Sequence, residues 1–165
     1  MRKLVMALAF VAAGVFVSGS AQAAPTYVGA KKCKMCHKKD AKGNQWKSWG
    51  DSMHAKAFES LAKDGKQADA ACLKCHSTTG DGKFKEGVGC ESCHGPGSDY
   101  KKGSVMKDSA KAKAAGLVPP GEAMCKKCHG GKLPKGHAKA SETGKIKSDF
   151  NYAKFSKAVA HPNPS

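Results

Sequence analysis

Four Cys-x-x-Cys-His units use every cysteine of this 165-residue chain. The units are Cys33–His37, Cys72–His76, Cys90–His94 and Cys125–His129. This pattern is the attachment motif of c-type haem. Two thiols three positions apart reach the two vinyl groups of one porphyrin, and the adjacent histidine lies below the iron as its proximal ligand. The pattern therefore predicts four covalent haems.

The thioether donors and the proximal ligands follow directly from the motifs. The predicted thioether cysteines are Cys33, Cys36, Cys72, Cys75, Cys90, Cys93, Cys125 and Cys128. The predicted proximal ligands are His37, His76, His94 and His129. Two alternative uses of the cysteines compete with haem. Zinc tetrathiolate sites would leave the repeated histidine without a role, and disulfides within Cys-x-x-Cys units usually occur singly in redox enzymes.

The first 23 residues have the three parts of a secretory signal peptide. Arg2 and Lys3 form the charged start, residues 4–17 form an apolar run, and residues 21–23 form a small-x-small cleavage site. The run is too short for a comfortable membrane span. We expect cleavage near Ala23, export to the periplasm, and no stable membrane insertion of the mature chain. An uncleaved anchor is the alternative.

A mature chain of residues 24–165 has few apolar side chains with which to enclose four haems. Because so short a chain buries a limited surface by itself, the porphyrins must supply much of the core. The expected fold is mainly α with long loops, a small multihaem cytochrome c fold in one domain. Short helices should be wrapped around the haems.

The chain is strongly basic, with a net charge of +16 that falls to +14 once Arg2 and Lys3 are removed. Lysine pairs at residues 31–32, 38–39 and 101–102 flank or lie between the haem motifs, and the pair at 126–127 lies inside the fourth motif. A basic ring around an exposed haem edge would steer periplasmic redox proteins with acidic docking surfaces. Solubility alone is the competing explanation, and export argues against nucleic acid as a partner.

The histidines are too few for four haems with two histidine ligands each. The chain has seven histidines, and four of them are proximal. Only His54, His137 and His161 remain as distal candidates. One iron must therefore carry methionine, another ligand, or an open sixth position. Methionine would raise the reduction potential of that haem.

Two of the distal candidates lie beside predicted helical stripes. Asn44 is a plausible N-cap and Gly65 a stop for one helix, with an apolar stripe that His54 borders. The stripe consists of Trp46, Trp49, Met53, Ala57 and Leu61. A second short helix, capped by Asp149 and stopped by Pro162, brings His161 beside its own stripe.

The remaining candidates have no helical context that favours ligation. His137 lies in a loop without periodicity, where a solvated surface histidine is the alternative. Met106, between the third and fourth motifs, is the best methionine candidate, and a buried packing role is its alternative. Met35, Met53 and Met124 are expected to be packing residues.

Three segments together resemble the tetrahaem cytochrome c-554 family (cytochrome c554 and c-prime type). They are the first motif from Lys32, the helix of residues 46–61, and residues 87–97, Gly-Val-Gly-Cys-Glu-Ser-Cys-His-Gly-Pro-Gly. The resemblance implies periplasmic electron transfer through closely packed haems. By position it also implies that His54 lies opposite His129, that His161 lies opposite His94, and that the haem on His76 has the open site.

The first haem departs from the family pattern. The resemblance implies a distal histidine shortly after the Gly-Pro-Gly of the third motif, and residues 98–106 contain no histidine. Either Met106 replaces it, or His137 reaches the first haem from elsewhere.

The sequence supports an electron carrier between redox proteins as the leading function. The alternative is an enzyme acting on a small molecule such as nitric oxide or hydroxylamine at an open haem, which would need acid–base groups near the iron. A filament-forming nanowire subunit is a third hypothesis. No catalytic constellation beyond the haems is recognisable, so an electron carrier is the simpler interpretation.

Overall fold

Short helices joined by irregular segments make up the computed structural model, which describes residues 23–130, 137 and 150–162. The elements are α1 (Ala30–His37), η1 (Asp40–Lys42), α2 (Gln45–Gly50), α3 (Ala57–Ser60), η2 (Leu61–Asp64), α4 (Ala70–His76), α5 (Cys90–His94), α6 (Gly103–Met106), α7 (Ser109–Ala114), α8 (Glu122–His129) and α9 (Tyr152–Val159). The described part contains no strand. The expected mainly α fold with long loops is confirmed.

Each haem motif forms the last turn of a helix that ends at its histidine. α1, α4, α5 and α8 end at His37, His76, His94 and His129, respectively. Residues three and four positions apart share one face of a helix. The two cysteines of a motif therefore lie on one face, and the histidine follows at the end of the same helix.

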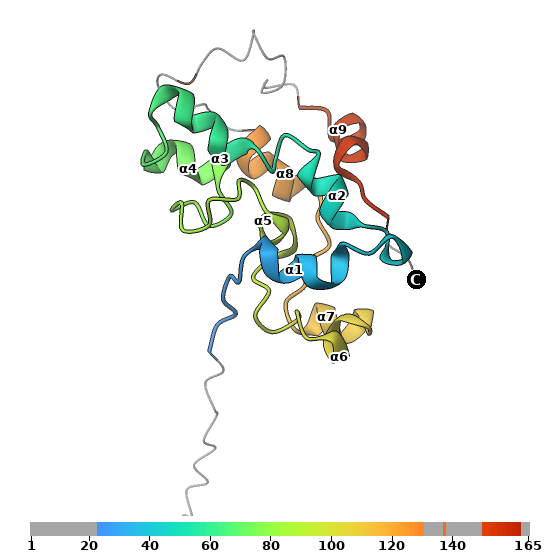
Figure 1. Cartoon of the computed structure of the whole chain (residues 1–165). Helices are drawn as coiled ribbons and strands as arrows, with labels where there is room; N and C mark the ends of the chain where they lie inside the picture. Colours follow the sequence, from blue (N-terminus) through green and yellow to red (C-terminus); the bar gives the residue numbers. More distant parts are fainter. Residues whose placement is uncertain (1–22, 131–136, 138–149, 163–165) are drawn as a thin grey trace, which may run out of the picture.

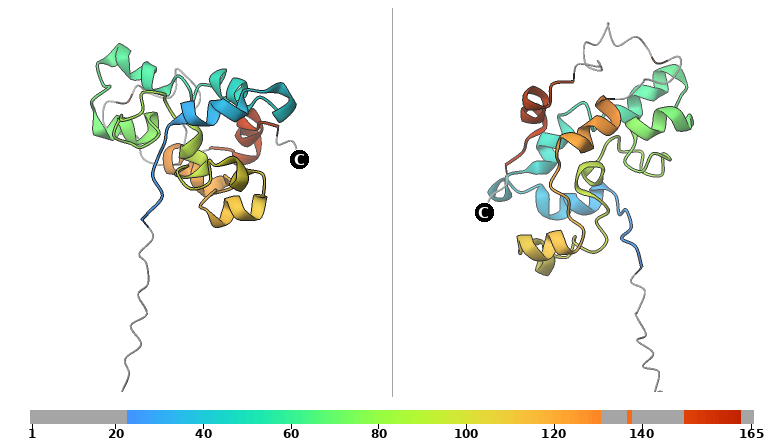
Figure 2. Two further views of the ribbon diagram at one scale, coloured as in Figure 1. Left: turned by 60° about the horizontal axis from the view of Figure 1, so that its bottom comes forward. Right: turned by 180° about the vertical axis from the view of Figure 1, so that it is seen from behind.

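The motif helices are distributed through the molecule. Figure 1 shows α5 and α8 near the centre, with α3 and α4 on one side and α2 and α9 on the other, while α1 lies below α5 and above α6 and α7. Seen from behind, α6 and α7 again lie below α1 (Figure 2). The polypeptide core is small. Its cluster of buried side chains consists of Phe58, Leu61, Cys72 and Leu73.

The predicted single helix between Asn44 and Gly65 is divided into α2, α3 and η2. Asn44 does cap α2, since its side chain accepts a hydrogen bond from the Lys47 amide, and Gly65 ends η2 with a φ of 64°. The prediction of one continuous helix is wrong because residues 51–56 form turns instead. Gly50 has a poor helix propensity, and the His54 carbonyl accepts from the Val88 amide at 2.9 Å.

The C-terminal helix α9 has a different cap from the one expected. Asn151 caps α9, with its side chain accepting from the Lys154 amide at 2.9 Å. Asp149, the predicted cap, lies outside the described residues. The helix ends at Val159, so His161 lies just beyond it, after Ala160 in extended backbone and before Pro162.

Two glutamates hold the start of α1, which has no side-chain cap of its own. The Glu86 carboxylate accepts from the Ala30 amide at 2.8 and 2.9 Å. Glu91, only 1% exposed, accepts from the Gly29 amide at 2.7 Å. Carboxylates at a helix N-terminus satisfy free amides and favour the helix dipole.

Glu91 also connects three segments of the chain. Its two oxygens accept from the Val28 amide at 3.0 Å each, and one accepts from the Gly97 amide at 2.6 Å. The Gly97 position allows no side chain, since an added Cβ would lie 2.9 Å from the Glu91 oxygen. The third motif is thereby fixed against the start of the first.

The proposed signal peptide, residues 1–23, lies outside the described residues except for Ala23. Within the part of the chain that is described, no helix is long and apolar enough to cross a membrane.

Replacing Glu91 should destabilise the protein strongly. Glu91→Leu leaves several amides near residues 28, 29 and 97 without an acceptor, and each buried unsatisfied group costs about 1–3 kcal/mol. We expect the free energy of unfolding of the haem-loaded protein to fall by about 3 kcal/mol or more, measured by denaturant titration with circular dichroism. Glu59→Gln, at an exposed position, is the control and should change it by less than about 0.5 kcal/mol. Equal effects of the two variants would contradict this role.

Candidate haem-binding site

The proximal histidines are oriented by hydrogen bonds at Nδ1. His76 Nδ1 lies 2.9 Å from the Ala57 carbonyl, and His94 Nδ1 lies 3.2 Å from the Val118 carbonyl. A carbonyl can only accept, so in both rings Nδ1 carries the proton. His37 Nδ1 lies 3.1 Å from Gln45 Oε1. In each ring Nε2 is left as the metal-binding nitrogen, the arrangement that second-shell acceptors usually give a ligating imidazole.

The fourth proximal histidine is held differently. His129 Nδ1 is buried and has no hydrogen-bond partner among the described residues. Instead, the Phe150 ring stacks on the His129 ring, with centroids 4.9 Å apart and planes 15° apart. Phe150 in turn stacks on Phe155 of α9 at 5.6 Å. An aromatic column therefore joins the fourth motif to the C-terminal helix.

Three pairs of histidine rings face each other at nearly the same spacing. The ring centroids of His54 and His129 are 5.9 Å apart, and those of His94 and His161 are also 5.9 Å apart. The rings of His76 and His137 are 6.0 Å apart. Each pair combines a motif histidine with one of the three histidines outside the motifs.

This spacing fits one metal ion between two imidazoles. A metal–nitrogen bond of about 2 Å on each side gives ring centroids about 6 Å apart. Direct packing of two rings has no reason to repeat that value three times. The donor set also fits haem iron, which takes histidine on both axial positions.

Burial favours the neutral, metal-binding form of three of the six paired rings, those of His54, His94 and His129. Burial lowers the pKa of His54, and the neighbouring His129 lowers it further. Burial also lowers the pKa of His94 and that of His129. A lowered pKa means that the imidazole is neutral over a wider pH range, and the neutral ring is the ligand.

The backbone around residue 87 fixes His54. The His54 carbonyl accepts from the Val88 amide at 2.9 Å, and Trp49 Nε1 donates to the Val88 carbonyl at 2.9 Å. Gly87 approaches so closely that an added Cβ would lie 2.3 Å from the His54 carbonyl oxygen. Its φ of 75° is also a conformation that favours glycine. Trp49 thus positions the segment that holds His54.

Gln45 connects the first motif to the segment that carries His161. Its Oε1 faces His37 Nδ1, while Nε2 donates to the Pro162 carbonyl at 2.7 Å and to the Lys42 carbonyl at 2.5 Å. The Gln45 side-chain amide therefore lies between His37, the proximal histidine of the first motif, and Pro162, which directly follows the distal candidate His161.

The motif cysteines lie in neighbouring pairs, with thiols standing for the thioether sulfurs of the haem-loaded protein. Hydrogen bonding between Cys33 and Cys90 lowers the pKa of Cys33 and, with burial, raises that of Cys90. Burial and the neighbouring Cys75 raise the pKa of Cys128.

The third and fourth motifs are also close to each other. Burial and the neighbouring Cys125 raise the pKa of Cys93. The neighbouring cysteines thus place the first motif near the third, the third near the fourth, and the fourth near the second. All eight cysteines are free thiols in the structure, with no disulfide among them.

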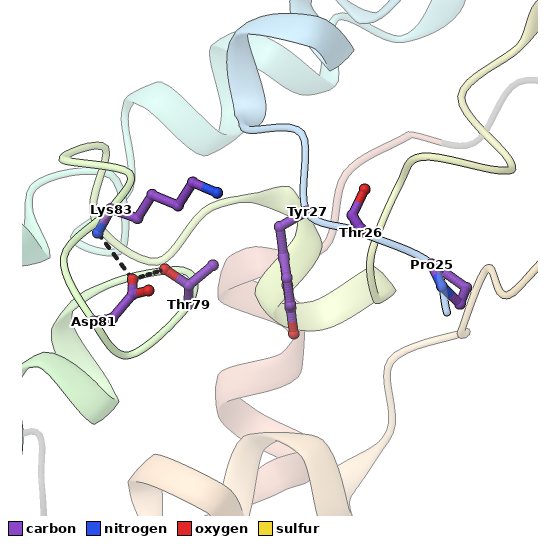
Figure 3. A pocket seen from close by; sticks show the side chains of 6 residues that line it. All are labelled: Pro25, Thr26, Tyr27, Thr79, Asp81 and Lys83. Atoms are coloured by element: carbon purple, nitrogen blue, oxygen red, sulfur yellow. Dashed lines mark hydrogen bonds between the residues drawn. The ribbon is translucent and has the colours of Figure 1, made fainter. Parts of the chain in front are cut away.

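A cavity of 380 Å³ on the surface lies apart from the histidine pairs. It is lined by Pro25, Thr26, Tyr27, Thr79, Asp81 and Lys83. Figure 3 shows Asp81 accepting from the Thr79 hydroxyl and from the Lys83 amide, so its carboxylate closes a local turn. None of its lining residues is a histidine, cysteine or methionine, so we assign it no haem.

The geometry agrees with two implications of the family resemblance and differs from a third. His54 lies opposite His129 and His161 opposite His94, as implied. The haem on His76 was expected to be open, but His137 lies opposite it. The His137 ring thus lies beside His76 of the second motif. Met106, the other candidate for the first motif, ends α6 and is half-buried.

Sequence reasoning missed Gln45, Glu86 and Glu91. Glu91 carried one available indication, an acidic residue inside a motif of a strongly basic chain. Gln45 carried none, because its contacts with His37 and Pro162 arise only from the tertiary fold.

Comparison with known proteins gives a consistent result. The family model "cytochrome c554 and c-prime" matches residues 32–95. Cytochrome c-554 of Nitrosomonas europaea is 35% identical over 154 residues, which cover 76% of this chain and 63% of that protein. The chain thus spans somewhat less than two thirds of the length of this relative.

A solved structure shares the fold. The structure of reduced cytochrome c554 from Nitrosomonas europaea matches with a TM-score of 0.51 and 28% identity, over 82% of this chain and 79% of that one. The relative is a multihaem c-type cytochrome, and the family carries covalent haem c. With its haem motifs, its opposed histidine pairs and these similarities, the chain belongs to the cytochrome c554 and c-prime family.

Proposed function

We propose that this protein is a periplasmic tetrahaem cytochrome that carries electrons between redox proteins. The observation that supports this most directly is the threefold repeat of a motif histidine facing a second histidine at 5.9–6.0 Å. Bis-histidine iron has no free coordination position and changes its charge without exchanging ligands. Such sites suit electron transfer rather than substrate binding.

The haem ligands follow from the pairs and the motifs. We assign His54 and His129 to the fourth haem, and His94 and His161 to the third. The eight motif cysteines supply the thioethers. When bound, the haems supply one-electron redox chemistry, while the chain orients the imidazoles through Ala57, Val118 and Gln45.

The contacts between motifs supply a route for electrons. Cys33 with Cys90, Cys93 with Cys125, and Cys75 with Cys128 join neighbouring motifs in the order first, third, fourth, second. α4 and α8 also approach at the Cys128 thiol, which lies 3.9 Å from the Lys74 carbonyl. Porphyrins attached at such neighbouring sulfurs would form one continuous chain, with the first and second haems at its ends.

The proposed partners are acidic redox proteins. The lysines of the four pairs named above are all exposed in the structure. They flank the first motif, lie inside the fourth, and follow the third. A positive surface close to the haem edges would raise the rate of encounter with an acidic donor or acceptor.

The haem count is the first test of this function. Expressed in a periplasm with haem-attachment enzymes, the protein should have the mass of residues 24–165 plus four haems, because each motif accepts one. Intact-mass spectrometry measures this. Cys75→Ser should lower the attachment at one motif only. A zinc-containing protein without haem would contradict the proposal.

Removing a distal histidine should open one haem. His54→Ala should add a high-spin ferric signal to the electron paramagnetic resonance spectrum, because the fourth iron loses its sixth ligand. His54→Met is the matched variant. It should keep the haem low-spin and raise its reduction potential. Spectra of both variants that equal those of the unmodified protein would show that His54 is not a ligand.

Electron exchange with an acidic partner should depend on salt. Raising the ionic strength from low to physiological values should lower the second-order rate by about tenfold or more, because screening shortens the range of the lysine field. Stopped-flow reduction by an acidic flavodoxin measures the rate. Reduction by an uncharged small molecule is the control and should stay constant. A flat salt profile with the acidic partner would exclude steering.

A further inference from the structure

We infer that the haem on His37 has its sixth coordination position open to a small external ligand. In the haem on His76, His137 occupies that position. The inference rests on the proposed tetrahaem function. It concerns which of four motifs lacks a histidine partner, and it reverses the arrangement that the family resemblance implies.

The first step is the complete assignment of the histidines. All seven histidines of the chain lie among the described residues. Six of them form the three facing pairs. His37 is the seventh, and its described ring contact is the hydrogen bond to Gln45. No histidine remains for the distal side of the haem on His37.

The second step concerns the haem on His76. The His76–His137 centroid distance of 6.0 Å differs by only 0.1 Å from those of the other two pairs. His76 Nδ1 faces the Ala57 carbonyl, so Nε2 is available to the metal. His137 therefore has the same relation to His76 that His54 has to His129.

The third step shows that the proximal side of the first haem is complete. α1 is held at its start by Glu86 and Glu91 and at its end by the contact of His37 with Gln45. Cys33 and Cys36 precede His37 at the motif spacing. The site can therefore hold haem by two thioethers and one imidazole, and what it lacks is a histidine from another segment.

Methionine is the remaining donor to weigh. Met35 lies inside the first motif and Met124 directly before the fourth, so both belong to segments that hold a haem from its proximal side. Met53, next to His54, is 66% exposed. Among the described methionines, Met106 remains as a competitor, and the experiment below includes it.

The expected ligands are small neutral π-acceptors, such as carbon monoxide or nitric oxide. Ferrous haem with a single histidine binds them, whereas a second histidine blocks the position. No electron moves in the binding of carbon monoxide, which makes it the cleaner probe. A ligand at the first haem would sit at one end of the proposed electron route.

Carbon monoxide titration of the fully reduced protein tests the inference. With four haems established by mass, the unmodified protein should bind one carbon monoxide, and His137→Ala should bind two. In the unmodified protein, resonance Raman should show one iron–histidine stretching band. Gln45→Glu should shift this band, because a charged acceptor makes the His37 imidazole more electron-rich. Ser60→Ala removes a group 3.2 Å from His76 Nδ1 and should leave the band in place.

Several results would overturn the inference. One is the absence of carbon monoxide binding together with a near-infrared sulfur-to-iron band that Met106→Leu removes, which would make Met106 the ligand. Another is one carbon monoxide in both the unmodified protein and His137→Ala. An iron–histidine band that shifts in Ser60→Ala but not in Gln45→Glu would place the open haem on His76. Fewer than four haems by mass would instead refute the proposed function.

Discussion

A single buried carboxylate determines how the first and third haem motifs lie against each other. Glu91 occupies an interior position of the third motif. It accepts amide hydrogen bonds from Val28 and Gly29, directly before α1, and from Gly97 of the Gly-Pro-Gly turn. Because α1 has no cap of its own, its orientation depends on this residue and on Glu86. The positions of His37 and of the neighbouring sulfurs follow from that orientation.

In the other three motifs, different groups orient the proximal histidine. Backbone carbonyls orient His76 and His94, and an aromatic column packs on His129. A chain with few buried apolar side chains thus fixes its imidazoles by polar contacts and ring stacking. The polypeptide sets the orientation of the imidazole rings, and the porphyrins of a haem-loaded protein would fill the space between the helices.

Local features were predictable from the sequence, and long-range ones were not. The haem motifs, the Asn44 cap and the Gly65 stop depend on neighbouring residues, and the structure contains the last two as predicted. The division of the helix after Gly50 depends on Val88, and the partner of His137 depends on the whole chain path. Neither interaction leaves a periodic pattern, so residue spacing alone could not identify them. The family resemblance implied two of the ring pairs, but it did not imply the third, between His76 and His137.

The facing histidines also bear on how the chain is cross-linked. Each of the three pairs encloses at least sixty residues, and the three intervals overlap. The pairs are His54 with His129, His76 with His137, and His94 with His161. Under the proposed ligation, each iron closes a long loop with a reversible bond, while the thioethers hold each haem to only a short stretch of chain. Closing a long loop removes much of the entropy of the unfolded chain. The axial bonds would then act as reversible cross-links between distant parts of the chain. The segment after the fourth motif would supply the second histidine, His137 or His161, for two of the three.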